Sequence, residues 1–256
     1  MATSEEQFDR QAAHYNAQWN QWSEVSLKWL VEHSHCSKDH RVLDVATGTG
    51  FTALAFSGLA KQVVGLDVSE GMLKQAREQA SAKGIHNVTF EKGPAEELPF
   101  AGAGFDFVTC RVAPHHFLSI PKFCAESYRV LRAGGRLLVA DTTVPDGEPE
   151  VDEWQNKVEA IRDTSHVRNC SPAEWRSFAE QAGFVIEDVV ELEEEAPMQM
   201  RDWMKKSGCA GEAAKQVERM FADAPAGARE QFRITHQADG DFTFQWMRVV
   251  LSARKA

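Results

Sequence analysis

The stretch from Val42 to Gly50, with the sequence VLDVATGTG, constrains the fold more than any other part of this chain. Its first half is a short apolar run typical of a buried strand, and its second half consists of small residues and glycines. Apolar residues then recur at helical spacing between Phe51 and Leu59. A strand, a glycine turn and a helix in this order predict the opening of a doubly wound α/β sheet. In such a sheet, glycine lets the backbone approach a ligand at the carboxyl end of the strand.

The same turn also fits the dinucleotide-binding pattern GxGxxA, so an NAD-type oxidoreductase is one alternative. Asp44 argues against it, because a carboxylate inside the strand, four residues before the first glycine, would repel a pyrophosphate. A cofactor with an ammonium and a sulfonium group would tolerate that charge or be held by it. A glycine turn that binds no ligand is the other alternative.

Composition limits the kind of protein and of partner. With 256 residues, of which 43% are hydrophobic and 26% charged, the chain is typical of one globular α/β domain with an elaboration, or of two small domains. The formal net charge of -10 argues against nucleic acid as a partner, because phosphate binding needs clustered Lys and Arg. No apolar run approaches the roughly 20 residues of a membrane span.

Targeting signals and metal motifs are not evident in the sequence. The N-terminal residues 1–6 are not typical of a signal peptide. The five cysteines show no paired spacing, which indicates reduced thiols and a cytoplasmic location. His33, His35, Cys36 and His40 lie close together, but their spacing matches no zinc pattern, so we expect a solvated loop and no metal.

Strand-like and helix-like segments alternate in the first part of the chain, which predicts parallel strands with right-handed crossovers. The strands are expected at residues 42–45, 63–67, 88–90, 105–110 and 137–140. We interpret the chain as a single domain, with cap helices in 1–40, a cofactor-binding core in 41–145, and acceptor-side helices with the last two strands in 146–256.

The second half of the chain contains further helices and two more expected strands. The pattern predicts a helix around Trp154, a helix that begins at the capping box Ser171–Glu174, and a sixth strand from Phe184. An inserted pair of helices is expected in 196–230. Alternation over 242–251 predicts one long final strand.

Five segments together resemble the class I methyltransferases that use S-adenosylmethionine, in particular the small-molecule branch with the ubiquinone and menaquinone C-methyltransferases. They are VLDVATGTG, VVGLDVSEGMLKQA, GPAEELPF, FDFVTCRVAPHHF and VLRAGGRLLVAD, and their order and spacing are more specific than any one alone. The resemblance covers nearly the whole chain. It implies a Rossmann-like sheet in the order 3-2-1-4-5-7-6 with the last strand antiparallel. It also implies S-adenosylmethionine as methyl donor and S-adenosylhomocysteine as product.

The resemblance implies which residues hold the cofactor. Asp67 ends the second strand, where its carboxylate can accept both ribose hydroxyls. Val68 and Met72 would offer apolar contacts to the adenine, whereas Pro94 stands where the family commonly has an aspartate at the adenine edge. The expected cofactor contacts are Tyr15, Asp44, Ala46, Gly48, Gly50, Asp67, Val68, Met72, Ala95, Glu96 and Arg111.

The acceptor is expected above the fourth strand, beyond the carboxyl ends of the sheet. Methyl transfer is an in-line displacement, which requires a positioned nucleophile, excluded water and, in some reactions, removal of a proton. His116, His115 and His166 are candidates for the base, although a structural hydrogen bond explains His116 equally well. Arg168 could hold an anionic acceptor group or only tie down a loop. The expected contacts of a small aromatic or hydrophobic acceptor are Trp19, Arg168, Met200, Trp203 and Phe244.

Two further expectations concern closure and function. The N-terminal helices with Tyr15, Trp19 and Trp22, and the 196–230 segment, are expected to cover the acceptor and exclude water. A non-catalytic module that binds S-adenosylmethionine as a sensor or partner-binding unit shares every cofactor motif with the enzyme, so it is the alternative function. The NAD-type oxidoreductase is the lower alternative.

Overall fold

The computed structural model describes residues 4–11, 24–193 and 196–256. Within this part, a seven-stranded sheet has the order β3-β2-β1-β4-β5-β10-β6. Its strands are β1 Arg41–Val45, β2 Gln62–Asp67, β3 Val88–Lys92, β4 Phe105–Arg111, β5 Leu131–Thr142, β6 Phe184–Glu193 and β10 Met247–Lys255. The strands β1 to β5 pair in parallel, and β10 runs antiparallel to both β5 and β6. The predicted fold class, strand order and antiparallel last strand are therefore confirmed.

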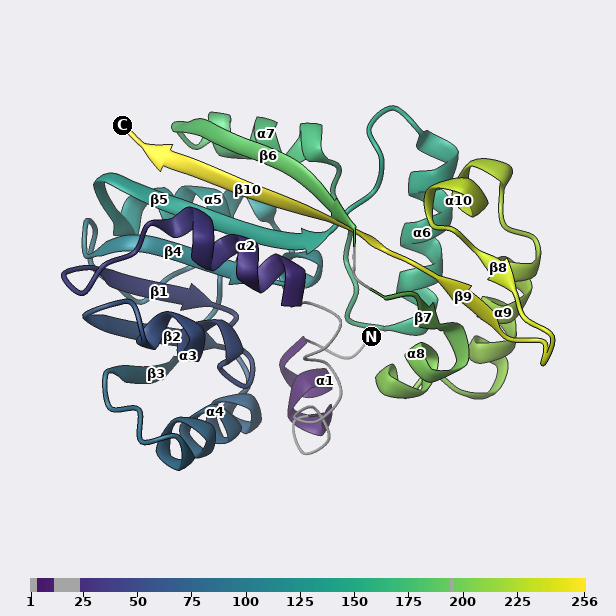
Figure 1. The fold of residues 1–256 in the computed structure, drawn as a ribbon, viewed down its shortest axis with the longest axis horizontal. Coiled ribbons are helices and arrows are strands. Elements are labelled where there is room, and N and C mark those ends of the chain that lie inside the picture. The colour runs from purple at the N-terminus through teal and green to yellow at the C-terminus, as the bar shows by residue number, and fades with distance from the viewer. Residues whose placement is uncertain (1–3, 12–23, 194–195) are drawn as a thin grey trace.

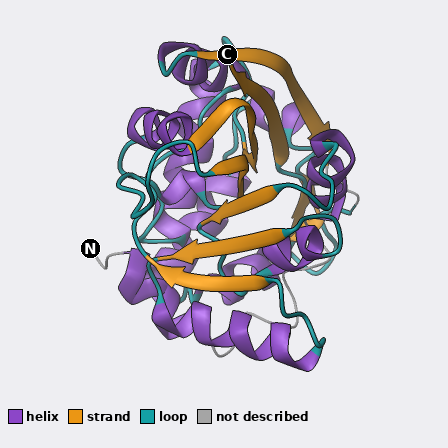
Figure 2. Ribbon diagram, turned by 90° about the vertical axis from the view of Figure 1, so that its left-hand side faces the viewer, coloured by secondary structure: helices purple, strands orange, loops and turns teal. Residues whose placement is uncertain are grey.

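Helices cover both faces of the sheet (Figure 2). They are α2 Glu24–Ser34, α3 Phe51–Ser57, α4 Glu70–Ala82, α5 Ile120–Val130 and α7 Pro172–Gln181. One buried apolar cluster joins α5 and α7 to one face, and a second joins α2 and α3 to the other. The central strands are mainly apolar because both of their faces are covered. The predicted capping box starts α7: Ser171 accepts from the Glu174 amide, and Glu174 accepts from the Ser171 amide.

A second lobe lies beyond the end of the sheet to which the parallel strands point (Figure 1). It contains the helices α6 Pro149–Arg162, α8 Met200–Ser207, α9 Gly211–Ala222 and α10 Ala226–Gln231, and a small sheet of β7 Met198–Gln199, β9 Phe242–Phe244 and β8 Thr235–His236. Aromatic side chains pack edge to face in its core, with 4.6 Å between the ring centres of Phe244 and Trp246. The lobe belongs to the 146–256 segment, and the single-domain interpretation stays a prediction.

Two sequence-based expectations for this lobe are wrong in detail. The expected single strand over 242–251 is two strands, because β9 pairs in the small sheet whereas β10 pairs with β5 and β6. The break falls at Gln245, whose backbone amide bonds to the Phe232 carbonyl at 2.8 Å instead of continuing a ladder. The segment 196–230 holds α10 in addition to the expected pair of helices.

The N-terminal part is described only as α1 Ser4–Gln11 and then from α2 onward. Tyr15, Trp19 and Trp22, which the sequence analysis assigned to the cofactor, the acceptor or the cover, lie outside the described residues. None of the helices in the described ranges has both the length and the apolar character needed to cross a bilayer.

Candidate active site

The turn after β1 is stabilised by hydrogen bonds to the carboxylate of Asp44, which is 1% exposed. Its carboxylate accepts hydrogen bonds from Thr47 Oγ1 at 2.6 Å, Thr109 Oγ1 at 2.7 Å and the Ala53 amide at 3.1 Å. Burial raises the pKa of Asp44 to about 6, against the effect of these bonds. Asp44 does not line the cavity described below, so it positions the turn and the start of α3 and does not face a ligand.

The two glycines of the turn have different roles. Gly48 has φ +54° and lines the cavity, and a Cβ built on it would meet no atom within 4 Å. Gly50 has φ +90°, and its Cβ would lie 3.1 Å from Ala76 Cβ and 3.3 Å from the Phe90 ring. Gly48 thus leaves room for a ligand, whereas Gly50, predicted as a cofactor contact, lies outside the lining and lets α3 pack against α4 and β3.

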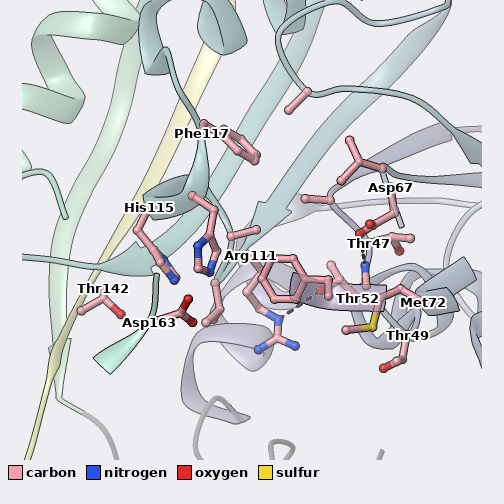
Figure 3. Close-up of a pocket in the computed structure, with 18 of the residues that line it drawn as sticks. Thr47, Thr49, Thr52, Asp67, Met72, Arg111, His115, Phe117, Thr142 and Asp163 are labelled. Carbon is pink, nitrogen blue, oxygen red and sulfur yellow. Dashed lines mark hydrogen bonds between the residues drawn. The ribbon is translucent and has the colours of Figure 1, made fainter. Parts of the chain in front are cut away.

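Asp67 connects this turn to the next helix. Its Oδ2 accepts a hydrogen bond from the Gly48 amide at 2.8 Å, and its Oδ1 accepts one from the Ser69 amide at 2.9 Å. Burial raises the pKa of the Asp67 carboxyl, and the backbone donors oppose this shift. Asp67 lines the cavity, and Figure 3 shows its bond to Gly48 there. Each carboxylate oxygen accepts more than one hydrogen bond, so the group can also receive ligand hydroxyls.

A cavity of about 360 Å³ opens at the carboxyl ends of the parallel strands (Figure 3). Predicted cofactor residues form one half: Ala46, Gly48, Asp67, Val68, Met72, Ala95, Glu96 and Arg111. Residues of the second lobe and its neighbours form the other half: Thr142, Glu159, Arg162, Asp163, Met198, Trp203, Trp246 and Arg248. Its volume lies in the range of small-molecule sites. The cavity is therefore continuous from the glycine turn to the second lobe.

Thr49 also lines the cofactor half of the cavity, and its hydroxyl is unusual. Its Oγ1 is buried without a hydrogen-bond partner among the described residues. Buried hydroxyls in native proteins are generally paired, so an orphaned one beside a cavity fits a ligand that supplies the partner. On the same wall, Arg111 is anchored by the bond from its Nε to Thr52 Oγ1 at 3.0 Å.

His115 lines the cavity from the short 3-10 helix Pro114–His116 that follows β4. Asp141, at the end of β5, accepts from the His115 amide at 2.7 Å, and its other oxygen lies 2.6 Å from His115 Nδ1. Burial alone would lower the pKa of His115, but the charge and hydrogen bond of Asp141 outweigh it and raise the pKa. Asp141, which the sequence analysis did not select, is thus paired with a cavity histidine.

The other two candidate histidines have different surroundings. His116 lines the cavity, and its Nδ1 lies 3.1 Å from the Ser165 carbonyl oxygen. Burial and the neighbouring His115 lower the pKa of His116 to about 3. His166 is outside the cavity lining, and its Nε2 lies 3.0 Å from Asn156 Oδ1. Burial lowers the pKa of His166 to about 2. His166 therefore lies beside the site, with its ring centre 5.8 Å from that of His115, but it does not line the cavity.

Of the predicted acceptor contacts that lie in the described part of the chain, one lines the cavity and three do not. Trp203 lines the cavity, but Met200 and Phe244 are fully buried in the core of the second lobe. Arg168 makes two 2.9 Å bonds to Asp152 and further bonds to Glu174, so the structure gives it the loop-tying role that the sequence left open. Met200, Phe244 and Arg168 are therefore absent from the cavity lining, because the first two pack in the core of the second lobe and Arg168 bonds to Asp152 and Glu174.

Charged residues that sequence reasoning did not select line the half of the cavity formed by the second lobe and its neighbours. Arg162 Nη1 lies 3.4 Å from Glu159 Oε2, and the Arg162 guanidinium lies 4.6 Å above the Trp203 ring. Burial raises the pKa of Glu159, while Arg162 opposes this shift. Arg248 of β10 donates to the Thr142 hydroxyl. In the sequence, Glu159 and Arg162 are marked only by their place in or directly after the helix predicted around Trp154, and Arg248 only by its place in the final strand. This signal is too weak to identify them.

The helix α1 lies between the large sheet and the second lobe (Figure 1), and its side chains contact residues on both sides of the cavity. On the cofactor side, Asp9 accepts from the Gly71 amide at 3.0 Å and from the Ser69 hydroxyl at the start of α4. On the acceptor side, Gln7 Nε2 donates to Asp163 Oδ1 at 3.1 Å. Phe8 lines the cavity with its ring 4.9 Å from the His116 ring. This part of the N-terminal segment is placed where a cover was expected.

The histidines before β1 have partners of their own. His33 stacks on Trp29 with 4.1 Å between ring centres, and His40 Nδ1 accepts from the Ser37 amide at 3.0 Å. Among the described residues, no three His, Cys, Asp or Glu side chains form a group suited to a metal ion.

Comparison with known proteins identifies the family. The family model described as "Methyltransferase domain" matches residues 42–135. The uncharacterized methyltransferase YcgJ of Bacillus subtilis is 35% identical over 93% of this chain and 93% of its own length. Its crystal structure has a TM-score of 0.86 and covers 90% of this chain and 98% of that one.

A demethylmenaquinone methyltransferase of Bacteroides fragilis is 34% identical over 50% of this chain and 52% of its own length. The fold, the glycine turn with Asp67 and the nearly full-length match to YcgJ agree with one another. The chain therefore belongs to the S-adenosylmethionine-dependent methyltransferases.

Proposed function

We propose that this methyltransferase binds S-adenosylmethionine in the half of the cavity formed by the glycine turn and Asp67, and methylates a small organic acceptor in the half under the second lobe. The observation that carries this proposal is the continuity of the cavity. Expected cofactor residues, two histidines and the side chains of α6 and α8 line the same space. A donor and an acceptor held there would meet without crossing solvent.

The residues of the cofactor half fit the donor. Asp67 would accept the ribose hydroxyls, and Val68 and Met72 would contact the adenine. The open space at Gly48 fits the approach of a polar ligand, as does the Thr49 hydroxyl, which has no hydrogen-bond partner in the described part of the chain. When bound, S-adenosylmethionine supplies a methyl carbon on a positively charged sulfur, which an acceptor attacks in line.

The acceptor half fits a compact molecule with a flat apolar part. Met198, Trp203 and Trp246 offer apolar and aromatic surface, and the Arg162–Glu159 pair offers polar contacts at the same end. The net charge of -10 disfavours a nucleic acid acceptor. A histidine of the cavity would take the proton that a protic acceptor loses. α1 would keep water out of the joined halves, since it contacts both.

Calorimetric titration with S-adenosylhomocysteine tests the donor site, and we expect one site per chain. A screen of phenols, quinones, amines and thiols for release of S-adenosylhomocysteine tests the transfer. Heat with S-adenosylhomocysteine but no turnover across these classes would favour the non-catalytic sensor. No heat with S-adenosylhomocysteine together with saturable NADH binding would contradict the proposal.

A further inference from the structure

We infer that Asp141 and His115 form the proton-accepting pair of this methyltransferase, and that its acceptor is a protic nucleophile of the phenol or enol class. The inference rests on the proposed function, since it concerns the acceptor side of the same cavity. It assigns His115 as the catalytic base and Asp141 as the residue that positions it.

The geometry fixes which nitrogen of His115 can act. Asp141 is 2% exposed, and both of its oxygens are directed at residue 115, one to the backbone amide and one to Nδ1. An ionised carboxylate only accepts hydrogen bonds, so Nδ1 carries the hydrogen and Nε2 keeps the lone pair. No described residue forms a hydrogen bond with Nε2. Figure 3 shows the His115 ring among the side chains that line the cavity.

The neighbouring histidines lack this arrangement. His116 faces a backbone carbonyl, which holds no negative charge, and its low pKa makes it a poor proton acceptor near neutral pH. His166 lies outside the cavity lining. Asp163 also favours a protonated His116 ring, but the His116 ring bonds to Ser165 and not to a carboxylate. Of the two histidines that line the cavity, only His115 therefore has a buried carboxylate bonded directly to its ring.

Other titratable groups also face His115, including His166, whose ring centre lies 5.8 Å from that of His115 and whose protonation would oppose that of His115. Glu159 of α6 favours the protonated ring, whereas Arg248 of β10 and any charge on His116 oppose it. Arg162 lies against Glu159, and Asp163 is bonded to Gln7 and Ser165. Asp141 is thus the largest influence that favours protonation, and its removal should lower the pKa of His115.

A base of this kind matters only if the acceptor loses a proton. Thioethers and tertiary amines are methylated without losing one, whereas hydroxyls, thiols and primary or secondary amines lose theirs. Among these, a phenol or enol hydroxyl depends most on a base, because it ionises less readily than a thiol and, unlike an amine, is a weak nucleophile before it loses its proton. The acceptor oxygen would give its proton to His115 Nε2 and form the new bond to the methyl carbon, while the carbon–sulfur bond breaks with its electron pair on sulfur. The imidazolium that results is paired with Asp141. The products are the methyl ether, S-adenosylhomocysteine and a proton that His115 later releases to water.

The test uses the full chain with two sets of acceptors and measures release of S-adenosylhomocysteine. The protic set contains catechol, hydroquinone and 2-naphthol, and the set without a transferable proton contains thioanisole and N,N-dimethylaniline. We expect turnover with the protic set alone. His115→Asn should lower kcat by about 10²- to 10⁴-fold, the usual contribution of a general base. Asp141→Asn should do nearly the same, since its amide would turn the ring to the wrong tautomer.

The pH profile separates this role from a structural one. The base must be neutral, so kcat should rise with pH through the pKa of His115, and Asp141→Asn should move that rise to lower pH with a reduced plateau. His40→Asn and Asp106→Asn are matched controls, because His40 and Asp106 also bond backbone amides but lie outside the cavity lining. Both controls should retain kcat and the position of the rise.

Three results would overturn the inference. The first is turnover confined to thioanisole or N,N-dimethylaniline, and the second is phenol turnover that survives His115→Asn. The third is no turnover with any acceptor by a protein that still binds S-adenosylhomocysteine, which would reject the acceptor class while leaving the donor site intact. Absence of S-adenosylhomocysteine binding would instead reject the proposed function.

Discussion

Asp67→Asn is the sharpest test of the donor site, because the substitution keeps the shape of the side chain and removes its charge. In the structure, Asp67 accepts the Gly48 amide with one oxygen and the Ser69 amide with the other. An asparagine can accept with its single oxygen, but its NH₂ group would then face a backbone N–H. One side of the connection between the glycine turn and α4 is therefore lost, along with one acceptor for the ribose.

The expected loss follows from the strength of hydrogen bonds to charged groups, which each contribute about 1.5–3 kcal/mol. Losing one such bond to the ligand weakens affinity by roughly tenfold to 100-fold, since about 1.4 kcal/mol corresponds to a factor of ten. The lost backbone acceptor should also lower the melting temperature by several degrees, because about 1 kcal/mol shifts it by roughly 2–4 °C in a chain of this size.

Calorimetry with S-adenosylhomocysteine measures the affinity, and thermal unfolding measures the stability. Asp106→Asn is the matched control: Asp106 also lies on a strand of the large sheet and accepts a backbone amide, that of Arg41 at 2.7 Å, but it does not line the cavity. This control should lose stability and keep its affinity. If Asp67→Asn bound S-adenosylhomocysteine as tightly as the unmodified chain, the ribose could not be bound by Asp67.

The remaining predictions concern the turn and the helix that covers the cavity. Because burial raises the pKa of Asp44 to about 6, its contribution to stability is full below pH 4 and is lost as pH rises from 4 to 6. Asp44→Asn should remove this loss, so between pH 4 and 6 the free energy of unfolding of the variant should rise by up to about 3 kcal/mol relative to that of the unmodified chain. Denaturant unfolding at each pH measures it, and a difference in unfolding free energy that does not change with pH would contradict the prediction. Gly50→Ala should lower the melting temperature more than Gly48→Ala, because only a Cβ at Gly50 meets neighbours at 3.1–3.3 Å. Gly48→Ala should instead weaken S-adenosylhomocysteine binding more than Gly50→Ala. The reverse order in either measurement would refute the roles assigned to the two glycines. Removal of residues 1–22 should leave a folded chain with weaker cofactor binding and no methyl transfer, since α1 contacts both halves of the cavity. A truncated chain with full activity would show that α1 is ordinary surface packing.

Residues in the half of the cavity that we propose for the cofactor could be selected from the sequence because their signals are local. Ala46, Gly48, Asp67 and Met72 each lie within a few residues of a strand end, and the carboxyl ends of parallel strands meet at one edge of the sheet. The resemblance to known methyltransferases depends on the same local strings. Gly50 was predicted as a cofactor contact, but only the structure shows that a side chain there would meet Ala76 and the Phe90 ring and that Gly50 does not line the cavity.

The half of the cavity that we propose for the acceptor was decided by the tertiary structure. Asp141 and His115 are 26 residues apart in the chain, and Gln7 meets Asp163 across a separation of 156. Local periodicity marks Met200 and Phe244 as apolar, but it does not indicate whether such a side chain faces a cavity or the core of a lobe. Whether a side chain faces the cavity or the core depends on how α6, α8, β9 and β10 pack against one another. Strand ends and turns are properties of neighbouring residues, whereas the acceptor side is formed by contacts between distant segments, which no short stretch of sequence specifies.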